Sequence, residues 1–223
     1  EGHRRPFAPC LTDENQLSVI AEIKRRSPSA GSFADWEQPE KLAEQYREGG
    51  ASAISVLTDA HFFGGRPAFV ARTRQTFPGP VLRKDFVHDE ADLALSAAMQ
   101  ADAVLLIVRI LGTRTADLIR LARCYDLETL VEVHDERELD LAMASGAPVI
   151  GINNRDLDDF SVDLGRSEEL MARIPRPIAV VSESGIRSTA QALRMRRGGA
   201  DAILVGQALA ENDGQGLNEL RVK

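Results

Sequence analysis

Short apolar runs alternate with segments of helical periodicity along the chain. Eight runs have the length and the apolar character of strands. They cover residues 18–23, 53–57, 80–82, 103–108, 129–133, 148–152, 178–181 and 202–205. Helical spacing follows between them, in residues 41–48, 89–99, 113–125, 136–145 and 188–197, and more weakly in residues 66–77. This order predicts an α/β fold in which helices connect the strands.

The composition of the runs and the glycines that follow the helical segments restrict the fold further. Each run is almost continuous in Val, Ile, Leu and Ala, as in parallel strands that are covered on both faces. Glycine follows several helical segments, at residues 49–50, 146 and 198–199, which is typical of helix C-caps. Eight such units in 223 residues match a closed barrel better than an open, doubly wound sheet. We therefore predict a single domain over residues 1–223, a (β/α)8 TIM barrel.

Charge excludes some classes of partner. The chain has 27 Lys and Arg residues against 34 Asp and Glu residues, a net charge of -7, and neither sign forms a long block. We expect no nucleic-acid or membrane partner, because either would need a basic face. The basic residues 194–197 are better explained as the last turn of a helix. An anionic small molecule remains possible as a ligand if basic residues lie close to its site.

The cysteines and histidines indicate neither a disulfide framework nor a metal site. Cys10 and Cys124 are the only two cysteines. His61, His88 and His134 lack ligand spacing, so we interpret them as surface or structural residues. The sequence has no apolar stretch typical of a secretion signal or a membrane span, and we expect a cytoplasmic protein. The oligomeric state is not determined by the sequence, which is compatible with a monomer.

Polar residues gather where the predicted strands end, which is where a barrel of this kind places its active site. A lone strand-end Lys or Glu is more often a solvated residue or a structural ion pair. Ionisable residues at several strand ends are costly to bury unless they pair or bind a ligand, so the convergence favours a functional site. Glu22 and Lys24 are two residues apart and point to the same side of their strand. The other strand-end residues are Lys84, Glu132, Asn153, Arg155, Glu183 and Ser184.

Two glycine-containing turns predict a phosphate subsite. Gly185 follows the seventh strand, and Gly206 with Gln207 follows the eighth. Glycine lets backbone N–H groups approach an anion closely, and these two loops are the usual phosphate-binding corner of such barrels. The alternative is that the glycines serve only the tight turns.

Several segments together resemble the indole-3-glycerol phosphate synthase family. They are IAEIKRRSPS at residues 20–29, LRKDF at 82–86, LVEVH at 130–134, GINNRDL at 151–157 and SESGI at 182–186. The resemblance covers nearly the whole chain from about residue 15 onward. The first segment, with the pattern E-x-K-x-x-S-P-S, is the most specific, whereas the Gly206 motif alone would be weak.

The resemblance implies an enzyme of tryptophan biosynthesis. The family closes an indole ring on 1-(2-carboxyphenylamino)-1-deoxyribulose 5-phosphate with loss of CO2 and water, which makes it a carboxy-lyase, and it uses no metal or organic cofactor. Lys84 matches the lysine that acts as general acid in ring closure, and Glu132 lies where it could hold or reprotonate that lysine. Glu22 and Lys24 match the residues associated with dehydration. The set of four is better supported than the role of each member.

The remaining matches concern substrate binding. Asn153 and Ser184 would position the substrate and its intermediates, Arg155 and Ser27 would bind the anthranilate carboxylate, and Glu183 would orient its neighbours. The apolar walls would come from Pro28, Phe63, Phe86, Ile107, Leu157, Phe160 and Leu204. We expect Trp36 to anchor the loop after the first strand. Family members usually carry an N-terminal extension that partly covers the barrel mouth, and here it is short or truncated, with about 17 residues before the first strand.

Two other classes of function remain open at this point. Another phosphate-binding barrel enzyme is one, such as a phosphoribosylanthranilate isomerase or a Schiff-base aldolase with Lys84 as nucleophile. A noncatalytic binding protein descended from the enzyme is the other. It would not need the combined acid–base set at the strand ends.

Overall fold

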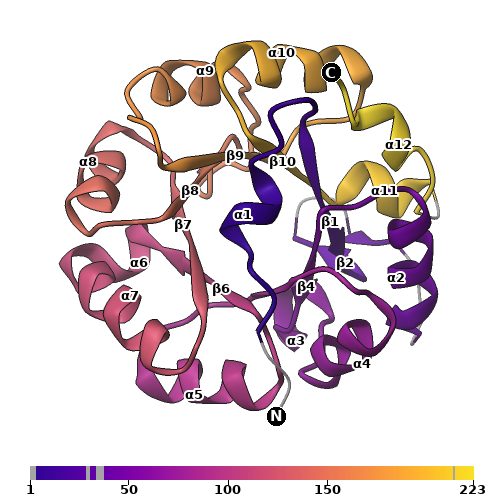
Figure 1. Cartoon of the computed structure of the whole chain (residues 1–223), viewed down its shortest axis with the longest axis horizontal. Helices are drawn as coiled ribbons and strands as arrows, with labels where there is room; N and C mark the ends of the chain where they lie inside the picture. Colours follow the sequence, from indigo (N-terminus) through magenta and orange to yellow (C-terminus); the bar gives the residue numbers. More distant parts are fainter. Residues whose placement is uncertain (1–3, 29–30, 34–37, 213) are drawn as a thin grey trace.

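The computed structural model describes residues 4–28, 31–33, 38–212 and 214–223, and its centre is a closed barrel of eight parallel strands. The strand order is β1-β10-β9-β8-β7-β6-β5-β4, and β4 pairs with β1 to close the ring (Figure 1). The strands are β1 Ser18–Ile23, β4 Ala53–Leu57, β5 Val81–Lys84, β6 Ala103–Ile107, β7 Glu128–Val133, β8 Val149–Asn153, β9 Ala179–Glu183 and β10 Ala202–Val205. The predicted barrel is confirmed, and each predicted run agrees with its strand to within two residues at either end.

Most helices form the outer layer around the barrel, whereas α1 lies across the end of the barrel (Figure 1). The longer ones are α2 Pro39–Glu48, α4 Ala68–Thr76, α5 Glu90–Ala98, α7 Thr115–Cys124, α8 Glu136–Ala144, α9 Gly165–Met171 and α10 Thr189–Gly198. The shorter ones are α1 Ala8–Leu11, α3 Ala60–Phe63, α6 Val108–Leu111, the 3-10 turn η1 Gly112–Arg114, α11 Gln207–Glu211 and α12 Leu217–Leu220. All five predicted helices are present, and the weakly predicted segment contains α4. The periodicity did not reveal α9 or the short helices, because two turns or fewer leave too few apolar repeats.

Alternating side chains of each strand pack into two different cores. On β1, Val19, Ala21 and Ile23 face the helices, whereas Ile20 belongs to a second cluster inside the barrel. Every strand residue of β1 is buried, which explains why the strands read as continuous apolar runs. Glu22 has the same parity as Ile20 and therefore points into the barrel, at the carboxyl end of β1.

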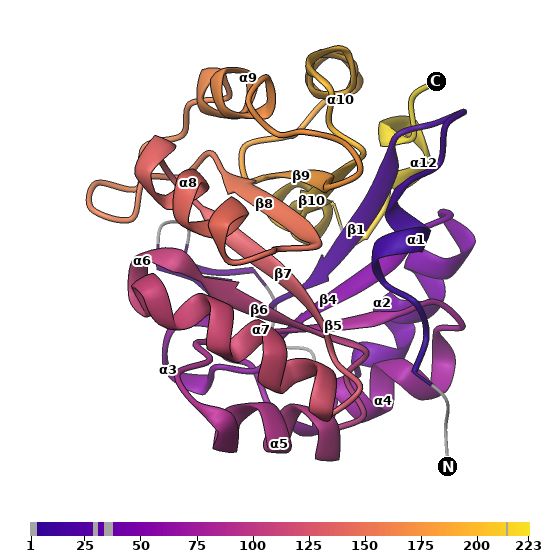
Figure 2. The same ribbon diagram turned by 60° about the vertical axis from the view of Figure 1, so that its left-hand side comes forward.

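The described part of the N-terminal segment closes the amino end of the barrel (Figure 2). Phe7 and Leu11 of this segment are fully buried in the inner cluster, together with small residues near the strand starts such as Ala53 and Ala202. The Glu128 carboxylate accepts hydrogen bonds from the backbone N–H groups of Phe7 and Ala8, both at 2.8 Å. Residues 4–17 thus lie at the end opposite to the strand-end polar residues.

A small antiparallel hairpin follows β1, formed by β2 Arg26–Ser27 and β3 Gly31–Ser32. It lies in the connection between β1 and α2, where the sequence indicated only a loop. Among the described residues, no helix has the length and apolar character needed to cross a membrane.

Candidate active site

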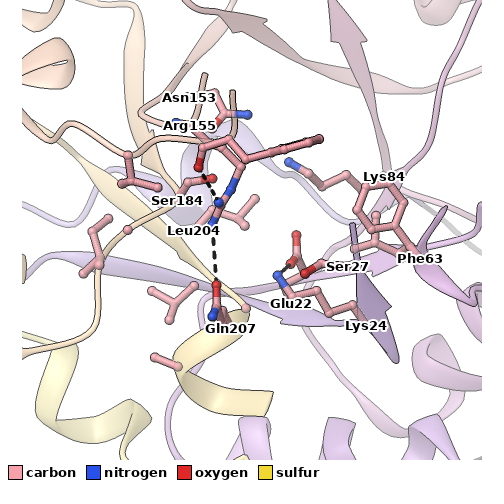
Figure 3. A pocket seen from close by; sticks show the side chains of 18 of the residues that line it. Glu22, Lys24, Ser27, Phe63, Lys84, Asn153, Arg155, Ser184, Leu204 and Gln207 are labelled. Atoms are coloured by element: carbon pink, nitrogen blue, oxygen red, sulfur yellow. Dashed lines mark hydrogen bonds and ion pairs between the residues drawn. The ribbon is translucent and has the colours of Figure 1, made fainter. Parts of the chain in front are cut away.

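A cavity of about 310 Å³ opens at the carboxyl ends of the strands. Most of the predicted site residues line it (Figure 3). They are Glu22, Lys24, Ser27, Pro28, Phe63, Lys84, Asn153, Arg155, Leu157, Phe160, Ser184, Gly185, Leu204, Gly206 and Gln207. Residues from six of the eight strands and the loops that follow them therefore meet in one place.

Glu22 and Lys24 form an ion pair at one wall of the cavity (Figure 3), with 2.7 Å between Glu22 Oε1 and Lys24 Nζ. Burial alone would raise the pKa of the Glu22 carboxyl, but the charges of Lys24 and Lys84 outweigh it and lower the pKa. Lys24 Nζ also lies 5.7 Å from the centre of the Phe33 ring, a cation–π distance. Glu22 is consequently a carboxylate, with an ammonium group as its direct neighbour.

Lys84 is held between two buried carboxylates. Its Nζ lies 2.6 Å from Glu183 Oε2 and 3.3 Å from Glu132 Oε2. Burial alone would lower the pKa of Lys84, but Glu183, Glu132 and Glu22 raise it above its ordinary value. Burial in turn raises the pKa of Glu183, against the opposing effect of Lys84. The sequence pointed to Glu132 as the partner of Lys84, and the structure adds Glu183 as the nearer one.

Two glycines make room for these carboxylates. A Cβ atom on Gly206 would lie 2.1 Å from Glu22 Oε1 and 2.9 Å from Lys24 Nζ. A Cβ atom on Gly151 would lie 2.1 Å from Glu183 Oε1. The sequence interpretation gave Gly206 only a phosphate-binding role, because the contact with Glu22 crosses from one strand to its neighbour and leaves no mark in sequence spacing.

Arg155 and Asn153 occupy the opposite wall. The backbone N–H of Arg155 donates to Asn153 Oδ1 at 3.0 Å, and its guanidinium donates to the Phe160 carbonyl at 3.0 Å and to Gln207 Oε1 at 3.5 Å (Figure 3). Burial lowers the pKa of Arg155, while Glu22 opposes the change. The guanidinium therefore connects the loop after β8 to the turn after β10.

Ser184 stands at the end of β9 with a positive φ of 65°. Its conformation is supported by Asn154, which is fully buried. Asn154 Nδ2 donates to Ser182 Oγ at 3.0 Å and to the carbonyl oxygens of Glu183 and Ser184 at 2.9 and 3.1 Å. The sequence motif at residues 151–157 contains Asn154, but the sequence assigned it no role. Its burial and its hydrogen bonds show that it supports the end of β9.

A basic corner lies beside these residues. Gly185 and Arg187 from the loop after β9 meet Gly206 and Gln207 from the turn after β10 in the cavity wall. Lys24, Lys84, Arg155 and Arg187 place four cationic side chains around the cavity of a chain whose net charge is -7. The sequence analysis did not predict Arg187 as a site residue. Its position two residues after Gly185, in the predicted phosphate-binding loop, could have indicated it.

Four predicted residues do not line the cavity. Glu132 and Glu183 lie beneath it and reach it through Lys84. Ile107 is buried in the inner cluster, and the Phe86 ring packs 6.4 Å from the ring of Phe63. Unpredicted lining residues besides Arg187 are Leu57, Val162, Ile186, Val205 and Ala208. Ser29 and Trp36 lie outside the described residues.

His134 is buried directly behind Glu132. Its Nδ1 lies 2.9 Å from Glu138 Oε2, and its Nε2 lies 3.4 Å from Glu132 Oε1. The imidazole is thus a structural neighbour of the Lys84 site, and neither His61 nor His88 is. Within the described ranges, no three His, Cys, Asp or Glu side chains are grouped as a metal-ligand set.

Comparison with known sequences gives one consistent result. A family model described as indole-3-glycerol phosphate synthase matches residues 2–220. An indole-3-glycerol phosphate synthase of Chlorobium phaeobacteroides is 46% identical over 92% of this chain and 80% of its own length. The indole-3-glycerol phosphate synthase 2 of Streptomyces coelicolor is 48% identical over the same shares, and that of Acetivibrio thermocellus is 45% identical over 90% of this chain and 78% of its own.

Comparison with solved structures supports the fold alone. Thiamine phosphate pyrophosphorylase from Pyrococcus furiosus superposes with a TM-score of 0.69 at 19% identity, over 96% of each chain. N-acetylmannosamine-6-phosphate 2-epimerase from Clostridium perfringens gives a TM-score of 0.70 at 13% identity, over 96% of this chain and 94% of its own. At such low identity the likeness concerns the barrel and carries no statement about activity.

Proposed function

The chain belongs to the indole-3-glycerol phosphate synthase family, and from that premise we propose how its own residues close the indole ring. The substrate is 1-(2-carboxyphenylamino)-1-deoxyribulose 5-phosphate, and the products are indole-3-glycerol phosphate, CO2 and water. The observation that carries the proposal is the presence of two lysine–carboxylate groups in one cavity. One is Lys84 with Glu183 and Glu132, and the other is Lys24 with Glu22.

Lys84 is the general acid of ring closure in this proposal. The aromatic carbon that bears the carboxylate attacks the ketone carbon, and Lys84 Nζ gives a proton to the ketone oxygen as its negative charge develops. Departure of CO2 then returns its bonding electron pair to the ring, which becomes aromatic again. The low exposure of the site strengthens the electrostatic effect of the lysine, because water screens it little.

Glu22 and Lys24 carry out the dehydration. The hydroxyl produced by ring closure must leave from the carbon next to the CH2 group that bears the nitrogen. Glu22 takes a proton from that CH2 group, and Lys24 gives a proton to the departing hydroxyl. Their separation of 2.7 Å allows one proton transfer between them to restore both groups.

The walls of the cavity suit the three parts of the substrate. Backbone N–H groups near Gly185, Gly206 and Gln207, together with Arg187, bind the phosphate. Arg155 and Ser27 bind the anthranilate carboxylate, and Asn153 and Ser184 position the intermediates. Pro28, Phe63, Leu157 and Leu204 surround the aromatic ring, with Phe86 and Ile107 supporting them from behind.

A Schiff-base aldolase is less consistent with the site. Such an enzyme needs a neutral lysine as nucleophile. Here two carboxylates raise the pKa of Lys84 and keep it cationic. This charge state favours proton donation over attack on a carbonyl carbon.

We extend the proposal to the setting in which the enzyme works. We infer that residues 1–223 form one catalytic (β/α)8-barrel domain that acts as a monomer, since one chain supplies both lysine–carboxylate groups. Loss of CO2 makes the enzyme a carboxy-lyase. Cys10 and Cys124 are both free thiols, which suits the reducing conditions of the cytoplasm.

The direct experiment is to mix the purified protein with the carboxyphenylamino-deoxyribulose phosphate and to follow indole fluorescence. We expect product to form without any added cofactor. A folded protein that forms no product would contradict the proposed function. Borohydride treatment during turnover serves as the companion test, and a trapped adduct on Lys84 would favour the aldolase.

A further inference from the structure

A line of ionisable side chains leads from Lys84 through the barrel wall. Glu132 Oε2 lies 3.3 Å from Lys84 Nζ, and Glu132 Oε1 lies 3.4 Å from His134 Nε2. His134 Nδ1 then lies 2.9 Å from Glu138 Oε2, and Glu138 Oε1 accepts from Arg109 Nε at 2.9 Å. The side chain of His134 is 1% exposed and that of Arg109 is 33% exposed, so the line ends at the outer surface.

Glu138 fixes one side of the imidazole. Its carboxylate accepts from the backbone N–H of His134 at 2.8 Å, from the ring and from Arg109. Burial alone would raise the pKa of Glu138, but the hydrogen bonds with His134 and Arg109 lower it to about 2. Because Glu138 is therefore an acceptor only, His134 Nδ1 carries a hydrogen.

The other side of the imidazole lies next to Glu132. His134 Nε2 has no hydrogen-bond partner among the described residues, and Glu132 Oε1 is the charged atom opposite it. Two facing lone pairs without a hydrogen would be costly in a buried site. A hydrogen on His134 Nε2 or on the Glu132 carboxyl would relieve this repulsion between the two buried atoms.

The reaction creates a need for such a proton. Loss of the carboxylate as CO2 and of the ketone oxygen as water takes up one proton per turnover. Dehydration itself balances, because Glu22 gains a proton while Lys24 loses one. The net uptake therefore falls on ring closure, in which Lys84 gives up the proton.

Lys84 alone is a poor source of that proton. If Lys84 gave up its proton, Glu183 and Glu132 would face each other without a cation between them, in a site with little water. A second proton that moves to Lys84 as the first one leaves would keep the ammonium charge in place. Of the two carboxylates that form ion pairs with Lys84, Glu132 also lies 3.4 Å from an imidazole, that of His134.

We propose that His134 and Glu132 hold a stored proton that recharges Lys84 during ring closure, with His134 as a positioning residue that acts through Glu132. The ketone oxygen gains the Nζ proton, Lys84 regains a proton from Glu132, and His134 gives its Nε2 proton to Glu132 when the pair starts as imidazolium and carboxylate. The pair ends one proton short and takes it from solvent after the product leaves. This inference rests on the proposed function.

Two variants distinguish a role of His134 in proton storage from a purely structural role. His134→Gln keeps an amide near Glu132 but holds no transferable proton, whereas His134→Asn keeps a contact towards Glu138 and does not reach Glu132. We expect both to lower kcat at least about tenfold, with KM within about twofold of wild type. We also expect the single-turnover rate of either variant to become dependent on the concentration of buffer acid, which the wild-type rate is not. His88→Gln, an exposed histidine outside the site, should match wild type throughout.

Several results would overturn the inference. A His134→Gln enzyme with kcat within about twofold of wild type would mean that Glu183 or solvent supplies the proton. A lowered kcat that stays independent of buffer acid would leave His134 only a structural role. A wild-type protein without turnover would instead contradict the proposed function, which is a different failure.

A measurement on the wild-type enzyme covers the case in which the variants do not fold. Single-turnover ring closure is timed in mixtures of H2O and D2O. Two protons in motion, one leaving Nζ and one arriving there, predict a curved dependence of the rate on the deuterium fraction. A straight line would indicate a single proton in motion and would contradict the stored proton.

Discussion

Gly206 and Gly151 stand directly beside two carboxylates of the active site. In each case a Cβ atom would come within 2.1 Å of a carboxylate oxygen, of Glu22 or of Glu183. Any side chain there would displace the carboxylate from its lysine. The acid–base groups therefore depend on the absence of side chains on neighbouring strands as much as on their own identity.

Gly206→Ala tests this dependence. The added methyl group should push Glu22 away from Lys24, and a displacement of about 1 Å at reacting groups can lower kcat by roughly 10²-fold. We expect that loss with little change in melting temperature. Gly165→Ala is the matched control, because its Cβ atom would meet only the Asp163 side chain, at 3.0 Å, and it should keep normal activity. Normal activity of Gly206→Ala would show that the Glu22–Lys24 geometry is not critical.

Strand ends and the family resemblance predicted the site residues and the pairing of Lys84 with Glu132, but not the contact of Lys84 with Glu183. The spacing of two residues places Glu22 and Lys24 on one side of β1. By contrast, the contact of Lys84 with Glu183 joins β5 to β9, on different parts of the ring, and depends on barrel closure and on the room left by Gly151. No local pattern encodes such a distance.

Asn154 joins three elements at the base of the site. Its amide donates to the end of β9, and its Oδ1 accepts from the backbone N–H and the hydroxyl of Ser167 in α9, at 3.2 and 2.8 Å. The same side chain supports the positive φ of Ser184. Asn154 therefore couples the placement of α9 to the geometry of a catalytic strand end.

Asn154→Ala should damage stability and activity together. Removal of the amide leaves buried polar groups of Ser167 and Ser182 without this partner, and we expect the free energy of unfolding to fall by about 3 kcal/mol. Urea denaturation measures the loss, and kcat should fall as Ser184 moves. Asn218→Ala, at an exposed position, should change neither quantity. An Asn154→Ala protein as stable as wild type would contradict the role of this network.

Strands buried on both faces and long helices with one buried face were the most predictable elements. The strands gave long apolar runs, and α7 and α8 gave clear helical periods. The seven residues of α9 and the two-residue strands of the β2–β3 hairpin were not anticipated, because their position depends on tertiary contacts such as those of Asn154 with Ser167.

The two ends of the whole barrel have different tasks. The amino end is filled by Phe7 and Leu11, whereas the carboxyl end holds the cavity with its lysines and arginines. An acidic chain thus concentrates positive charge where an anionic substrate must enter. The composition gives the net charge of the chain, but it does not show that these lysines and arginines gather around the cavity.

The free energy of unfolding at low pH should depend on Glu138, which contacts His134 behind Glu132 and Lys84. The folded-state pKa of Glu138 is lowered to about 2 from 4.5, so its contribution to stability is complete above about pH 4.5 and is lost as the pH falls towards 2. We expect this loss to amount to roughly 2 kcal/mol, allowing for partial solvent screening. Urea denaturation of wild type and of Glu138→Gln should therefore show a steeper decline for wild type in that range. Parallel declines would mean that Glu138 is not stabilised as a carboxylate.

Ring closure belongs to Lys84 in the proposed mechanism, and dehydration to Glu22 with Lys24. Measuring CO2 and indole in parallel during single turnovers tests this division most directly. Lys84→Gln should slow both products by roughly 10²-fold or more, because it removes the acid of the first step. Glu22→Gln should release CO2 at nearly the wild-type rate while indole fluorescence lags by roughly 10²-fold. If Glu22→Gln delays CO2 as much as indole, or if Lys84→Gln still releases CO2 at the normal rate, the division of the reaction between the two groups is wrong.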